Sequence, residues 1–195
     1  MGRTGKIVLI SIGSFFGLII LIGFIFGMQL IGINNQFIEL EENVSNAWAQ
    51  VENQFQRRYD LIPNLVNTVK GYADHEEEVL TSVTEARAKV GSAQGREEQI
   101  EANGELSSAL SRLMVVKESY PDLKANENFL ALQSQLEGTE NRISVERRRY
   151  NEAVTAYNKF IRKFPNSILA SIQNKEPMEK FEADTGADEA PDVNF

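Results

Sequence analysis

The N-terminal part of the chain holds a long, uninterrupted run of apolar residues. Residues 7–33 carry no charged side chain, and only Ser11, Ser14 and Gln29 are clearly polar. As a helix, this run would span roughly 40 Å, which exceeds the ~30 Å hydrocarbon core of a bilayer. It is apolar on every face, unlike a core helix, and longer than the apolar part of a cleaved signal peptide. The pattern predicts an uncleaved transmembrane helix over residues 7–33, after a short tail of residues 1–6.

Beyond residue 33 the apolar positions recur mostly at steps of three and four. This spacing predicts a long amphipathic helix that continues from the anchor to about Gly71. Pro63 lies within it and is expected to kink it, because proline has no N–H and crowds the preceding turn. The apolar stripe consists of Phe37, Leu40, Val44, Ala47, Val51, Phe55, Ile62, Leu65, Val69 and Tyr72.

Three further helices are predicted from periodicity and stop signals. The second opens with Asp74 as N-cap and three carboxylates, Glu76, Glu77 and Glu78, in its first turn, and ends near Gly91. The third covers residues 96–118, before Tyr120 and Pro121. The fourth covers residues 126–164, with Asn126 as its N-cap and a near-heptad stripe typical of coiled coils. Two long and two shorter helices predict an all-α protein, an elongated antiparallel helical bundle over residues 34–172.

The remaining residues, 173–195, form an acidic segment. From residue 175 on there are two Lys and seven Asp or Glu, too polar a composition to fold alone. Apolar residues nevertheless recur in it, so we expect an extended tail that docks on the bundle or on a partner. The predicted docking residues are Phe181, Pro191, Val193 and Phe195.

Charge and composition narrow the possible functions. The net charge of −8 argues against a nucleic-acid partner, which requires a basic surface. Without cysteine, and with His75 as the single histidine, the chain has neither a credible zinc site nor a catalytic triad. We therefore predict no metal, no cofactor and no enzymatic activity, with a membrane-bound enzyme as the remotest alternative. Lys159, Arg162 and Lys163 are interpreted as a solvated face, with anionic lipid as the alternative partner.

The residues that flank the anchor predict its orientation. Arg3 and Lys6 precede it, whereas no Lys or Arg follows before Arg57. The positive-inside rule then places the N-terminus in the cytoplasm and the bulk of the chain outside it.

Small residues within the anchor suggest self-association. The pairs Gly13/Gly17 and Gly23/Gly27 fall within an arc of about 120° on a helix, which would let a second helix approach closely. We therefore expect a homo-oligomer.

Charged residues on the borders of the long helices predict an interhelical cluster. Arg58 on the first helix and Glu140, Glu146 and Arg147 on the fourth lie beside the apolar stripes. Half-buried charges must be paired, so ion pairs among these four are predicted. The alternative is a polar ligand pocket in the same place.

Several strings make the chain similar to the LemA family of bacterial membrane proteins. They are Asn46-Ala47-Trp48, RYDLIPNLV from Arg58, VKGYA from Val69, His75-Glu76, Glu85-Ala86-Arg87, LEGTENRI from Leu136, Arg149-Tyr150-Asn151, Phe181-Glu182-Ala183 and PDVNF from Pro191. The resemblance covers nearly the whole chain except residues 91–126. It implies a single-pass protein of the bacterial cytoplasmic (inner) membrane, with one anchor, an α-helical bundle and no established enzymatic activity. Because the family includes magnetosome membrane proteins, it also points to membrane organisation, while leaving the topology open.

Together these patterns predict a non-enzymatic, membrane-anchored helical scaffold. It would self-associate and organise membrane lipid and unidentified membrane or envelope proteins. The second hypothesis is a ligand-sensing, membrane-tethered ectodomain with a polar pocket between the long helices.

Overall fold

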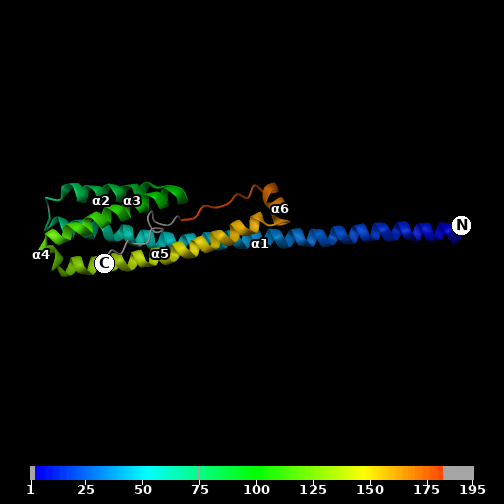
Figure 1. Cartoon of the computed structure of the whole chain (residues 1–195), viewed down its shortest axis with the longest axis horizontal. Coiled ribbons are helices and arrows are strands. Elements are labelled where there is room, and N and C mark those ends of the chain that lie inside the picture. Colours follow the sequence, from blue (N-terminus) through cyan, green and yellow to red (C-terminus); the bar gives the residue numbers. More distant parts are fainter. Residues whose placement is uncertain (1–2, 74, 182–195) are drawn as a thin grey trace, which may run out of the picture. The chain divides into compact units, whose positions relative to one another are not determined.

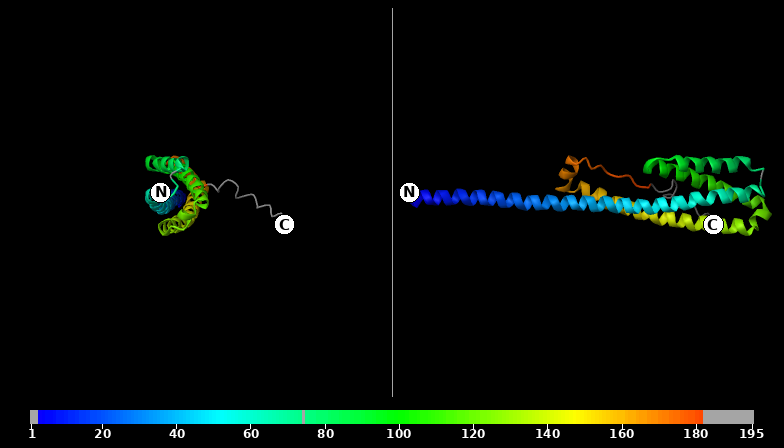
Figure 2. Two further views of the ribbon diagram at one scale, coloured as in Figure 1. Left: turned by 90° about the vertical axis from the view of Figure 1, so that its left-hand side faces the viewer. Right: turned by 180° about the vertical axis from the view of Figure 1, so that it is seen from behind.

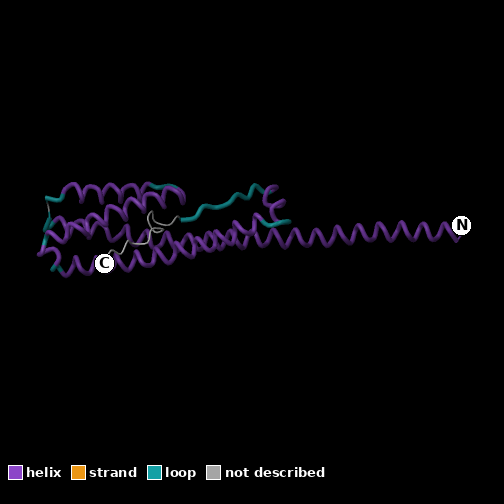
Figure 3. Tube along the Cα trace, viewed as in Figure 1, coloured by secondary structure: helices purple, strands orange, loops and turns teal. Residues whose placement is uncertain are grey.

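The computed structural model describes residues 3–73 and 75–181, with side chains described from residue 15 on. These residues form helices joined by turns, and no strand occurs within the described ranges (Figure 3). The helices are α1 (Arg3–Lys70), α2 (Glu77–Ser92), α3 (Gly95–Val116), α4 (Pro121–Lys124), α5 (Glu127–Arg162) and α6 (Asn166–Ile172), with a 3₁₀ turn, η1, at Lys117–Ser119 (Figure 1). The predicted all-α fold with one apolar N-terminal helix is confirmed.

The anchor and the first long helix are one continuous helix, α1. Its N-terminal part is long and apolar enough to cross a membrane, the one such helix in the described chain. Large apolar side chains there, such as Phe15, Ile20 and Phe24, are exposed. A surface of this kind is stable in lipid rather than in water. The helix passes through Pro63 and ends at Lys70, just before Gly71.

One of two predicted helix starts is confirmed, and the other differs from the prediction. Asn126 caps α5 as predicted, because its Oδ1 accepts a hydrogen bond from the Phe129 N–H at 2.9 Å. The predicted cap of α2, Asp74, lies outside the described residues. Glu76 occupies the N-cap position instead and makes no side-chain cap bond. Its Oε1 accepts a hydrogen bond from the Tyr120 hydroxyl at 3.0 Å. Because Glu76 is the N-cap, only Glu77 and Glu78 stand in the first turn of α2.

The short helices α4 and α6 extend the predicted set of four. Pro121 stands at the first position of α4, where its missing N–H is no loss. The fourth predicted helix ends at Arg162, and a cis Phe164–Pro165 bond separates it from α6.

The described chain divides into two compact units. The first contains residues 3–45 and 153–179, and the second contains residues 46–73, 75–152 and 180–181. In the first unit, Phe37 of α1 packs edge-on against Phe160 of α5, with ring centroids 5.1 Å apart. In the second, α2 and α3 lie side by side as a hairpin (Figures 1 and 2).

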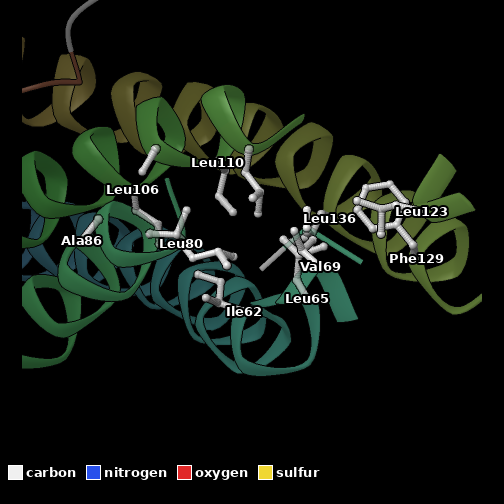
Figure 4. Close-up of a cluster of buried hydrophobic side chains, with 14 residues drawn as sticks. Ile62, Leu65, Val69, Leu80, Ala86, Leu106, Leu110, Leu123, Phe129 and Leu136 are labelled. Carbon is white, nitrogen blue, oxygen red and sulfur yellow. The ribbon is translucent and has the colours of Figure 1, made fainter. Parts of the chain in front are cut away.

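The main hydrophobic core lies in the second unit. Buried side chains from α1 to α5 converge there (Figure 4), including Ile62, Leu65, Val69, Leu80, Leu106, Leu110, Leu123, Phe129 and Leu136. Burial of such side chains contributes about 1.5–3 kcal/mol each. This core fixes α1, α3 and α5 against one another and so positions the polar groups described next.

Candidate functional site

Arg58 is the centre of a buried polar cluster in the second unit. Only 2% of its surface is exposed, and its guanidinium donates to groups on two other helices. Nη1 donates to Ser107 Oγ of α3 and to Glu140 Oε2 of α5, both at 2.7 Å. Nη2 donates to the Asn103 main-chain oxygen at 3.1 Å and to Asn103 Oδ1 at 2.7 Å. One side chain therefore ties α1 to α3 and α5.

Burial dominates the electrostatics of Arg58. It lowers the pKa of the guanidinium, because the charged form loses solvation, while Glu140 acts in the opposite direction through its charge and its hydrogen bond. Arg147 lowers the same pKa by like-charge repulsion. The Arg58 Nε–H is buried without a hydrogen-bond partner. The cluster is thus closed around two of the three guanidinium nitrogens.

The other two charged residues predicted for this cluster have different contacts. Glu146 Oε1 accepts from Arg149 Nη1 at 2.8 Å, within the same helix, and Glu146 Oε2 is buried without a partner. The Arg147 guanidinium carbon lies 4.8 Å from the centre of the Phe181 ring. The structure therefore brings Arg58 and Glu140 together, and directs Arg147 toward the tail.

Phe181 lies among aromatic side chains that we call the aromatic box: Trp48, Tyr150 and Phe181 itself. The Phe181 ring stacks on Trp48 with centroids 5.9 Å apart and meets Tyr150 edge-on at 5.5 Å. Such pairs contribute about 0.5–1.5 kcal/mol beyond simple burial. Of the predicted docking residues, Phe181 is thus buried within the second unit, whereas Pro191, Val193 and Phe195 lie outside the described residues.

An open cavity of about 620 Å³ lies beside the Arg58 cluster. It is lined by Glu52, Asn53, Phe55, Gln56 and Tyr59 of α1, Val90 and Gly91 of α2, Ala93, and Gln99 and Asn103 of α3. Its volume is in the range of small-molecule sites. The predicted pocket was placed between the long helices, where Arg58 and Glu140 instead meet at 2.7 Å.

Tyr59 is a structural centre that the sequence analysis did not single out. Pro63 has no N–H for the Tyr59 carbonyl one turn earlier, and Arg87 Nε of α2 donates to that oxygen at 3.3 Å. The Arg87 guanidinium also lies 3.8 Å from the centre of the Tyr59 ring. A Cβ on Gly91 would lie 3.1 Å from the Tyr59 hydroxyl, so glycine lets α2 approach closely. The sequence feature that could have indicated this role of Tyr59 was Pro63, which lies inside a helix four residues after it.

The anchor glycines face open space in the single chain. A Cβ built on Gly17, Gly23 or Gly27 meets no atom within 4 Å. The surroundings of Gly13 lie outside the described side chains. Among the described residues, no group of three or more His, Asp or Glu side chains is placed to hold a metal ion.

An all-helical domain joined by a continuous helix to an apolar N-terminal segment defines a class, the membrane-anchored helical proteins. The LemA family model matches residues 47–195, and the chain belongs to the LemA family. The resemblance found in the sequence is thereby confirmed.

Individual relatives extend this finding. The chain is 25% identical to Protein LemA of Metamycoplasma hominis over 147 residues, which cover 75% of this chain and 67% of the relative. It is 27% identical to Magnetosome protein MamQ 2 of Paramagnetospirillum magneticum over 180 residues, 79% of this chain and 66% of that protein. Magnetosome protein MamQ of Magnetospirillum gryphiswaldense is 26% identical over 173 residues, with 75% and 64% covered. The chain thus spans about two thirds of the length of these relatives, and their names specify no reaction.

Proposed function

We propose that this protein is a non-enzymatic, membrane-anchored scaffold that self-associates through its anchor. It would organise membrane lipid and membrane or envelope partner proteins in the bacterial inner membrane. The N-terminus lies in the cytoplasm in this proposal, as the basic residues before the anchor favour.

The observation that carries the proposal is the unused glycine face of α1. Glycine inside a helix costs about 1 kcal/mol relative to alanine, and a Cβ added at Gly17, Gly23 or Gly27 would meet no atom within 4 Å that requires glycine there. A second helix packed on this face would require it, because small residues let two backbones approach in lipid. Self-association gives these glycines a role that the single chain does not.

Energy transfer between labelled copies in proteoliposomes tests this self-association. Wild-type protein should show transfer that falls on lipid dilution, and Gly23→Leu should weaken association at least about tenfold. Gly32→Leu is the matched control, since Gly32 is equally open but lies outside the glycine arc. Wild-type protein that is monomeric at every lipid dilution, or a Gly23→Leu variant that associates normally, would contradict the proposal.

Orientation has its own test, because the chain contains no cysteine. Thr4→Cys and Ala156→Cys variants are labelled in intact cells with a membrane-impermeant maleimide. Labelling of only the Ala156 variant supports the proposed orientation, and labelling of only the Thr4 variant reverses it.

The cavity beside Arg58 favours a second candidate function, the sensing of a small polar ligand. Side-chain amides and two aromatic rings line it, and Asn103 connects it directly to Arg58. Thermal unfolding, followed by Trp48 fluorescence, would be measured with neutral sugars and amides. A compound that stabilises the wild type should lose its effect in Gln99→Ala. Stabilisation that persists in this variant would place the ligand elsewhere.

A further inference from the structure

The short helix α6 exposes its apolar face instead of burying it. Ile168 and Ile172 lie one turn apart and are 56% and 71% exposed, while Phe164, in the turn before α6, is 81% exposed. The opposite face, with Asn166 and Ala170, is buried. A helix on the surface of a water-soluble domain has the reverse arrangement. The exposed residues therefore form an apolar surface of the kind that a lipid bilayer or another molecule covers.

Hydrogen bonds hold α6 in this orientation. The buried Asn166 side chain donates from Nδ2 to the Phe160 carbonyl oxygen at 3.2 Å, one of the last carbonyls of α5. The Lys163 carbonyl accepts from the Ser167 N–H at 2.8 Å. The outward direction of the two isoleucines is thus fixed by polar contacts on the other side of the helix.

The same helix lies where the anchor ends. Gln173 Nε2, just after α6, donates to Asn34 Oδ1 at 3.0 Å, and Asn34 directly follows the apolar residues 7–33. Lys175 Nζ then forms an ion pair with Glu41 of α1 at 2.6 Å. All of these residues belong to the first unit. The exposed apolar surface therefore stands at the level at which α1 would leave the hydrocarbon core.

The sequence segment that contains α6 is positively charged, opposite in sign to the whole chain. Residues 153–175 contain four Lys or Arg and no Asp or Glu, although the whole chain has a net charge of −8. Lys159, Arg162 and Lys163 are exposed near the end of α5. Cations beside an apolar face are the combination that binds anionic lipid surfaces.

We propose that Phe164, Ile168 and Ile172 insert into the boundary between headgroups and acyl chains of an anionic bilayer, with Lys159, Arg162 and Lys163 on its phosphates. The α6 surface is thus a second membrane contact beside the anchor. The inference rests on the membrane anchoring in the proposed function and is independent of the proposed self-association.

The test uses the full chain in liposomes of phosphatidylcholine with phosphatidylglycerol. A nitroxide is attached at Ile168→Cys, and its collisions with oxygen and with a water-soluble nickel complex report its depth. We expect high oxygen and low nickel accessibility. The label on Ala156→Cys, an exposed position of α5 further from α6, is the matched control and should show the accessibilities of the aqueous phase.

Two further samples test the electrostatic part. Replacing Lys159, Arg162 and Lys163 by Gln, or removing phosphatidylglycerol, should raise nickel accessibility at position 168 several-fold. Unchanged accessibility in both would overturn the role of the cations.

Other outcomes at position 168 would overturn the inference itself. Nickel accessibility equal to that of the Ala156 control would mean that α6 stays in water. Low accessibility to both reagents would mean that protein, such as a second copy, covers it. Failure of the proposed self-association would leave these depths unchanged, so the two proposals fail separately.

Discussion

The Asn151 side chain forms hydrogen bonds with both main-chain polar groups of Phe181. Asn151 Oδ1 accepts from the Phe181 N–H at 2.9 Å, and Asn151 Nδ2 donates to the Phe181 carbonyl oxygen at 3.0 Å. In the first unit, Asn158 holds Met178 in the same way, with both distances 2.8 Å. An amide side chain supplies both a donor and an acceptor, as the main chain of a neighbouring strand would. Asparagines on α5 thus bind an extended segment that has no strand partner.

The first prediction concerns this attachment of the tail. Phe181→Ala should destabilise the second unit by about 3–5 kcal/mol, because it empties a buried aromatic site. Asn151→Ala should cost about 1–3 kcal/mol, because it leaves the partly buried Phe181 N–H and carbonyl oxygen without these partners. Urea unfolding followed by Trp48 fluorescence measures both, and Phe181→Ala should also shift Trp48 emission to the red. Glu152→Ala, exposed on the same helix, is the control. Equal stability of Asn151→Ala and this control would refute the role of the amide.

The second prediction concerns Arg58. Arg58→Ala should destabilise by about 3–5 kcal/mol, since it removes a buried ion-pair partner together with the donor for Asn103 and Ser107. Arg58→Lys should recover little, because an ammonium cannot reproduce the guanidinium fork. Glu140→Gln should cost about 1 kcal/mol, because Glu140 is 52% exposed and water replaces part of the interaction. An unchanged melting temperature for Arg58→Ala would exclude the structural role of this cluster.

The third prediction couples Pro63 to Arg87. Arg87→Met should cost about 1–3 kcal/mol, because it removes the donor to the Tyr59 carbonyl. In a Pro63→Ala background the main-chain N–H of residue 63 can donate to the Tyr59 carbonyl, so the free-energy cost of Arg87→Met should be smaller. A double-mutant cycle of urea unfolding measures the difference. Additive effects would show that the two residues act independently.

The fourth prediction concerns alkaline pH and Tyr157. Burial raises the pKa of the Tyr157 phenol, and the nearby Glu41 carboxylate raises it further by repelling the phenolate. The folded state therefore retains the phenolic proton more strongly than the unfolded state. Its contribution to stability is complete below the unfolded pKa of about 10 and is lost as the pH rises above it. Unfolding at pH about 8 and at pH about 11 should show this loss in the wild type and a smaller one in Tyr157→Phe. An identical pH dependence of stability in both proteins would refute this contribution of the Tyr157 phenol.

Periodicity was sufficient to predict the helices and most of the inward face of the first one. Leu65 and Val69 are buried as their spacing predicted, because steps of three and four leave one consistent core face, whereas Tyr72 at the end of the same stripe is 44% exposed. Helix ends depend on which nearby groups form hydrogen bonds with the first and last turns, and spacing alone does not predict this. Glu76 was expected to contribute to a helix start, but its carboxylate binds Tyr120, which is distant in the sequence.

The polar contacts were only partly predictable, for the same reason. The charge and border position of Arg58 and Glu140 indicated a pairing across helices. Neither Asn103 nor Ser107 carries a charge that would reveal its role, and both come from a part of α3 with little sequence signal. The outward face of α6 was also missed, because a helix of seven residues is too short for a reliable period.

Arg58 also constrains the route by which the second unit can assemble. While α3 and α5 are absent, its guanidinium remains hydrated, and its burial between α1 and either helix alone would leave donors without acceptors. Partly assembled states in which α1 has met only one of its two partners are therefore penalised. The arginine should make folding of the second unit cooperative, with α3 and α5 closing on α1 in a single kinetic step.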